Sequence, residues 1–116
     1  MPKKLIRSFK HAGLGASHTL RTQRNIWIHF FVAAVVFFFG IGMKLSTVEI
    51  SILTLTAAFV IVTEVINTAI EEIVNLVKPE EHPAAALIKN VAAGAVLVSA
   101  IGSIVIGLLI FIPRLI

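Results

Sequence analysis

The sequence contains no cysteine and no aspartate among its 116 residues. The absence of cysteine excludes disulfides, thiolate metal sites and a cysteine nucleophile. No GxxxxGK[ST] motif is present, which excludes a nucleotide site of the P-loop type. Charge is also scarce, because only 14% of the residues are charged, whereas 58% are hydrophobic and the mean hydropathy is +1.00. This composition lies outside the range of soluble domains and indicates a membrane protein.

Three long apolar segments fill most of the chain. Each is long enough to cross a bilayer, which takes about 20 residues of α-helix. The connections leave no room for a second domain, so residues 1–116 form a single unit. We therefore predict an all-α membrane protein with transmembrane helices at residues 26–43, 48–77 and 83–112. The third is rich in Ala, Gly and Ser, so we expect it at the centre of the helix packing, with Pro113 following its exit.

A fourth helix is predicted before the first span, at residues 3–24. Apolar side chains such as Leu5 and Phe9 recur there at helical spacing against basic ones such as Lys4 and Arg7. This pattern is typical of an amphipathic helix that lies on the membrane surface. A short helix packed on the other three is the alternative, and both descriptions can hold together. The segment lacks the features of a cleaved signal peptide.

The basic residues indicate the orientation of the chain. Six of the ten Lys and Arg residues precede the first span, whereas the connection to the second span holds only Lys44. The positive-inside rule then places the N-terminus in the cytoplasm, together with the loop between the second and third spans, and the C-terminus outside. We expect anionic lipid head groups rather than nucleic acid as partners, because the basic residues are not interleaved with exposed aromatic ones.

One polar stripe interrupts the second span. Glu64, Asn67, Glu71 and Asn75 fall within about 80° of one another at 100° per residue, so they share one helix face. Ionisable side chains at membrane depth are costly, which makes this stripe the first candidate for function. Polar contact between helices is the structural alternative. Glu72 departs from the stripe and is expected on a solvated face or with another partner.

The stripe offers two separable chemical roles. Glu64 and Glu71 are about 10 Å apart along the helix axis, too far to bind one ion together. Glu64, counted inward from the outer face, lies at the apolar edge, which suits a general base for a lipid hydroxyl. Glu71 lies at head-group level and could hold Mg²⁺, with Asn67 orienting either ligand.

Two further residues, Lys89 and His29, are possible functional residues in the other spans. Lys89 enters the third span near the level of the stripe, where it could offset charge on a transferring phosphoryl group, although a lysine snorkelling to the interface is an equal alternative. His29 in the first span has no second metal ligand at helical spacing, so we expect it to be a packed or hydrogen-bonded histidine.

Residues 64–75 (EVINTAIEEIVN) and 89–97 (KNVAAGAVL) resemble the signatures of the small prokaryotic diacylglycerol kinase family. Residues 7–13, 21–25 and 111–114, with His29, are similar to the Gram-positive branch, whose members phosphorylate undecaprenol. The resemblance covers nearly the whole chain. It implies a homotrimeric kinase of the bacterial inner membrane that transfers the γ-phosphoryl group of ATP to a lipid alcohol with Mg²⁺.

The resemblance also implies roles for individual residues. Glu64 matches the proposed general base, Glu71 a metal ligand, and Asn67 and Asn75 their supporting neighbours. Gln23 stands where the family has a second metal-binding glutamate. The nucleotide-binding residues implied are Lys4, Gln23, Glu71, Glu80, Glu81, His82, Lys89 and Asn90.

Three positions depart from the family pattern, because Gln23, Asn75 and Asn90 are amides where the family usually has acids. An amide oxygen can ligate a cation but supplies no charge, so the affinity for Mg²⁺ should fall. The alternative function is therefore a catalytically weak or inactive member that keeps the trimeric fold and binds lipid or nucleotide. A small channel or transporter subunit, using the buried acids as an ion path, is a third hypothesis.

Overall fold

The computed structural model describes residues 2–78 and 81–116. Within those ranges the chain forms four α-helices and no strand, with α1 at Pro2–Thr22, α2 at Arg24–Gly42, α3 at Thr47–Val77 and α4 at Pro83–Leu115. Helices α2, α3 and α4 are each long and apolar enough to cross a membrane. The predictions of an all-α chain and of three spans are thereby confirmed.

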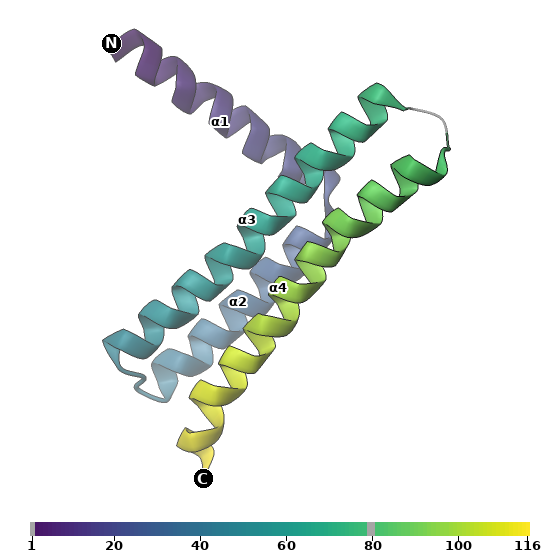
Figure 1. Cartoon of the computed structure of the whole chain (residues 1–116). Coiled ribbons are helices and arrows are strands. Elements are labelled where there is room, and N and C mark those ends of the chain that lie inside the picture. The colour runs from purple at the N-terminus through teal and green to yellow at the C-terminus, as the bar shows by residue number, and fades with distance from the viewer. Residues whose placement is uncertain (1, 79–80) are drawn as a thin grey trace.

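Helix α1 leaves the bundle at a steep angle, so that its N-terminus lies far from the other helices (Figure 1). Its only buried residue is Thr19, near its C-terminal end. Gln23 alone separates α1 from α2, and the indole Nε1 of Trp27 donates a hydrogen bond across this joint to the carbonyl oxygen of Leu20 at 2.7 Å. The bend is therefore fixed by local bonds. The membrane-surface location of α1 stays a prediction.

Helix α3 is the centre of the packing. It contacts α1, α2 and α4, whereas α4 packs along α3 and has no close backbone approach to α2 in the described part of the chain. The hydroxyls of Thr63 and Ser99 meet at 3.0 Å and tie α3 to α4 at membrane depth. The expectation that the third span lies at the centre is therefore wrong for one copy of the chain.

The small residues of α4 explain this difference. A Cβ atom added at Gly94, Gly102 or Gly107 would meet no described atom within 4 Å outside the helix's own backbone. Small residues permit close helix approach but do not determine which neighbour approaches. In one copy, these positions face open space.

The turn between α2 and α3 is held from both sides. Ser46 caps α3, because its hydroxyl accepts the Glu49 backbone N–H at 3.1 Å while the Glu49 carboxylate accepts the Ser46 N–H at 2.9 Å. Arg114 of α4 donates to the Glu49 carboxylate and to the carbonyl oxygen of Lys44, which adopts a positive φ of 57°. The far end of α4 is thus attached to the start of α3.

The predicted end of the third span needs a correction. Helix α4 continues three residues beyond 112, to Leu115, with Pro113 inside it. Proline lacks the N–H that would bond one turn back, but the last turn closes through the Ile116 N–H and the Ile112 oxygen at 3.2 Å. The contacts of Arg114 with the facing turn also favour the helical end.

Replacing the cap of α3 should lower stability. We expect Ser46→Ala to reduce the free energy of unfolding by about 1 kcal/mol, because the Glu49 N–H loses its acceptor at the helix start. Unfolding in detergent micelles, followed by circular dichroism, measures the change. Thr47→Ala is the matched control, since the Thr47 side chain forms no cap bond, and an equal loss in both variants would contradict this role of Ser46.

Candidate active site

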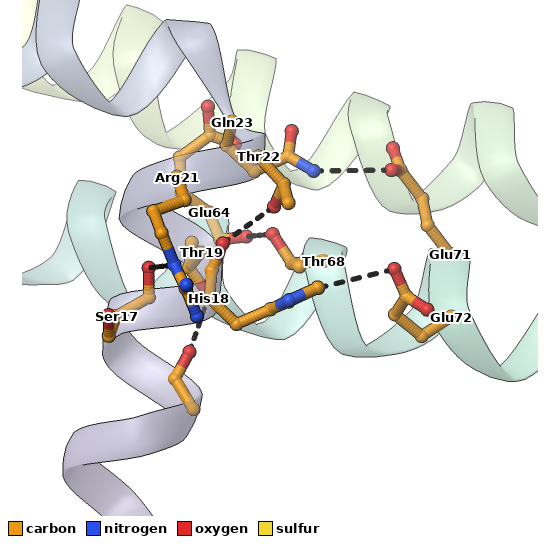
Figure 2. Close-up of polar contacts among 11 residues, drawn as sticks. Ser17, His18, Thr19, Arg21, Thr22, Gln23, Glu64, Thr68, Glu71 and Glu72 are labelled. Carbon is orange, nitrogen blue, oxygen red and sulfur yellow. Dashed lines mark hydrogen bonds and ion pairs between the residues drawn. The ribbon is translucent and has the colours of Figure 1, made fainter.

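Polar side chains gather where the joint between α1 and α2 meets the C-terminal half of α3 (Figure 2). Gln23 occupies the joint itself in an extended conformation and is the N-cap residue of α2, although its side chain does not cap the helix. That side chain instead reaches α3, where its Nε2 donates to Glu71 Oε2 at 3.5 Å. The break between the two helices therefore places an amide opposite the polar stripe.

A second amide contacts the same carboxylate. Asn67, one turn earlier on α3, donates from Nδ2 to Glu71 Oε1 at 3.2 Å. Asn67 is buried, and its Oδ1 has no hydrogen-bond partner among the described residues. Buried polar atoms are nearly always satisfied, so the unpartnered state of this oxygen is unusual. Gln23, Asn67 and Glu71 thus form one group across the helix joint.

Glu64 lies deeper in the bundle than this group. It is 2% exposed, and its carboxylate Oε1 is buried without a hydrogen-bond partner in the described structure. The nearest basic group is His29 on α2, whose Nε2 lies 3.8 Å from Oε1. The backbone oxygen of Glu64 accepts from Thr68 Oγ1 at 3.0 Å, which holds the helix but not the carboxylate. The carboxylate is therefore shielded, and its Oε1 faces His29 without a hydrogen bond.

Glu72 has a different environment. Its carboxylate lies 3.4 Å from Nε2 of His18 on α1, and both side chains are substantially exposed (Figure 2). Glu72 was predicted to lie on a solvated face or to contact another partner, and it is both exposed and in contact with His18. This contact was not foreseen for His18, because sequence spacing alone does not show which α1 residue faces α3. The contact joins α1 to α3 at the surface.

Lys89 of α4 meets the end of the polar stripe. Its Nζ donates to Asn75 Oδ1 at 2.6 Å. Helices α3 and α4 extend together past the level at which α1 joins the bundle (Figure 1). The lysine therefore joins α4 to the same polar face of α3 that carries Glu71 one turn earlier.

A pocket of about 510 Å³ lies beside Lys89 at the end of the α3–α4 hairpin. Its polar lining comes from Lys78, Glu81, His82 and Lys89. The ring of His82 caps α4, because Nδ1 accepts the Ala84 N–H at 3.0 Å. This size is within the range of small-molecule sites. Glu80, also predicted to bind nucleotide, lies outside the described residues.

Two predicted nucleotide-binding residues are not brought to these groups within one copy of the chain. Lys4 is exposed near the free end of α1, which projects away from the bundle (Figure 1). Asn90 is exposed and its side chain forms no hydrogen bond with any described residue. For Lys4 and Asn90 to bind the same nucleotide as these groups, a second copy of the chain or a change in conformation would be required.

The residues around Glu71 fit a nucleotide-assisted magnesium site. No cluster of three or more His, Cys, Asp or Glu side chains is found in the described ranges. Mg²⁺ is commonly held by one or two carboxylates together with substrate phosphates. Glu71 would supply one carboxylate, and the unpartnered Asn67 Oδ1 and the amide oxygen of Gln23 would be further hard donors.

A family profile and two relatives match this chain, and all three are described as lipid kinases. The sequence profile of the family described as prokaryotic diacylglycerol kinase matches residues 10–111. The chain is 43% identical over 112 residues to an undecaprenol kinase of Bacillus subtilis, covering 97% of this chain and 91% of the relative. It is 37% identical over 112 residues to a diacylglycerol kinase of Synechocystis sp., covering 96% of this chain and 64% of that longer relative.

No solved structure shows a significant match. The profile spans all of α2 and α3 and most of α4, so it includes the polar stripe, Lys89 and the joint at Gln23. The resemblance recognised from residues 64–75 and 89–97 is thereby confirmed. The chain belongs to the prokaryotic diacylglycerol kinase family.

Proposed function

We propose that this protein is an integral-membrane lipid kinase that transfers the γ-phosphoryl group of ATP to the hydroxyl of undecaprenol or diacylglycerol. The observation that carries the proposal is the buried carboxylate of Glu64, whose Oε1 lacks a hydrogen bond, on a residue about 10 Å along the axis of α3 from Glu71. An acidic side chain at membrane depth is costly to desolvate, which makes it a candidate for function. The names of the two relatives support the same class of reaction.

Glu64 is the general base in this proposal. Its buried carboxylate accepts the proton of the lipid hydroxyl while the alcohol oxygen attacks the γ-phosphorus in line with the departing ADP. Burial keeps water away from the carboxylate, so the competing hydrolysis of ATP is disfavoured. The chain supplies positioning and charge, which phosphoryl transfer chiefly needs.

Glu71, Gln23 and Asn67 would hold Mg²⁺. When bound, the cation would neutralise charge on the phosphates of ATP. The protein contributes a single negative charge to this group, because position 23 is an amide. We therefore propose that the cation binds mainly together with the nucleotide phosphates.

Lys89 and the hairpin pocket provide the nucleotide side of the site. The Lys89 ammonium, oriented by Asn75, offsets charge on the transferred group. Glu81, His82, Asn90 and Lys4 are the remaining nucleotide ligands proposed. No P-loop is needed, because charge and position come from helix faces rather than from a glycine-rich loop.

We propose a homotrimer in the bacterial inner membrane, with the N-terminus in the cytoplasm and the C-terminus outside. The distribution of Lys and Arg supports this orientation. Two features support assembly. The described residues of one copy bury only six hydrophobic side chains, and the glycine positions of α4 face open space. A neighbouring copy could also bring Lys4 to the site.

Removing the proposed base should nearly abolish transfer. We expect Glu64→Gln to lower the rate by about 10²- to 10⁴-fold, because the amide cannot accept the hydroxyl proton. ATP-dependent phosphorylation of undecaprenol and of diacylglycerol in mixed micelles measures the rate. Glu72→Gln is the matched control on the same helix and should keep most activity. Undiminished transfer in Glu64→Gln would remove Glu64 from the mechanism.

Adding a charge at the helix joint should tighten cation binding. We expect Gln23→Glu to lower the Mg²⁺ concentration that gives half-maximal velocity, because a second carboxylate then faces Glu71. Asn25→Asp adds the same charge at an exposed position of α2 and should not reproduce the effect. If the parent phosphorylates neither lipid while Gln23→Glu does, this chain is the weak family member rather than a full kinase.

Removing the charge of Lys89 should impair the nucleotide step. We expect Lys89→Met to lower the rate about 10²-fold and to raise the KM for ATP, because no ammonium then faces the phosphates. Lys44→Met, at the opposite end of the bundle, is the control and should leave both values unchanged. Steady-state kinetics at varied ATP distinguishes the two roles, since a lysine that only snorkels to the interface would leave the KM for ATP unaltered.

A further inference from the structure

Two polar atoms face one another inside the bundle without forming a hydrogen bond. One is Glu64 Oε1, buried and without a partner among the described residues. The other is Nε2 of His29, 3.8 Å away on α2. Hydrogen bonds between nitrogen and oxygen usually span 2.7–3.2 Å, so a small side-chain rotation would close the contact. Such bonds are often long in the absence of substrate and shorten in its presence.

His29 differs from the other histidines of the chain. His18 pairs with Glu72, His82 caps α4, and His11 is exposed on α1. His29 forms no hydrogen bond with any described residue, and its side chain is 23% exposed. It also lines an apolar cavity of about 320 Å³ between α2, α3 and α4. Its ring therefore stands between an apolar space and the buried carboxylate.

We propose that His29 is a positioning residue for Glu64. Its Nε2–H donates to Oε1 and turns the other carboxylate oxygen toward the hydroxyl of the incoming lipid alcohol. The inference rests on the proposed kinase function and adds a residue to that site. A histidine that served only to pack the bundle would leave the buried Glu64 Oε1 without a hydrogen-bond donor, which is costly for that oxygen.

The reaction balances with this arrangement. The hydroxyl proton passes to Glu64, the alcohol oxygen forms a bond to the γ-phosphorus, and the bond from that phosphorus to the β–γ bridging oxygen breaks with ADP as the leaving group. His29 keeps its proton throughout and never touches the phosphoryl group. Its contribution is the direction in which the carboxylate faces.

Two substitutions test this role in the full-length protein in mixed micelles. His29→Leu removes the donor, and we expect kcat to fall about tenfold or more while the KM for ATP is unchanged. His29→Gln keeps an N–H donor of similar reach, and we expect it to recover most of that loss. In a Glu64→Gln background, His29→Leu should cause no further loss, because residues that act as one unit are not additive.

Thr54→Val is the matched control, because Thr54 is an exposed hydroxyl of α3 that bonds only to the Ile50 carbonyl. It should retain parental activity. Full activity in His29→Leu, or an equal defect in His29→Leu and His29→Gln, would overturn the positioning role while leaving the kinase function intact. A parent chain that phosphorylates no lipid alcohol would overturn the proposed function itself, and the role of His29 with it.

Discussion

The structure depends on the cost of placing a carboxylate inside an apolar helix bundle. Glu64 is almost fully buried in α3, a helix that is apolar enough to cross a membrane. A group of this kind is tolerated where protein rather than lipid surrounds it. Helix α3 lies against α1, α2 and α4, and Glu64 and Asn67 of its polar face are buried, whereas Asn75 at the end of that face is exposed. The central position of α3 follows from what it carries.

The same polar face explains why the candidate site forms at a helix joint. A continuous helix through residues 2–42 would satisfy its own backbone and present no free side chain at a break. The extended conformation of Gln23 interrupts it, and the amide then reaches Glu71. Because the amide of Asn67 contacts the other oxygen of the same carboxylate, Glu71 is oriented from two helices at once. Such fixed orientation is what a site for hard cations and phosphates requires.

Much of this organisation follows from the sequence. Hydropathy predicts the three spans, because a run of about 20 apolar residues matches the length of helix that crosses a bilayer. Helical periodicity places Glu64, Asn67 and Glu71 on one face. The exit of α4 was mispredicted, since local rules treat Pro113 as a stop, whereas Arg114 attaches that end to the facing turn. Contacts between helices are the remaining limit. Periodicity along one helix does not show that His29 faces Glu64, nor that α4 packs on α3 alone.

The single-residue joint at Gln23 has a consequence for how the chain tolerates change in length. An inserted residue there would reorient α1 relative to α2, because Gln23 alone joins the two helices. His18 would then leave Glu72, and the Trp27 indole would leave the Leu20 carbonyl. These contacts fix the orientation of α1 relative to α2. A change in the tilt of α1 against its surroundings would therefore also change the direction of the Gln23 amide.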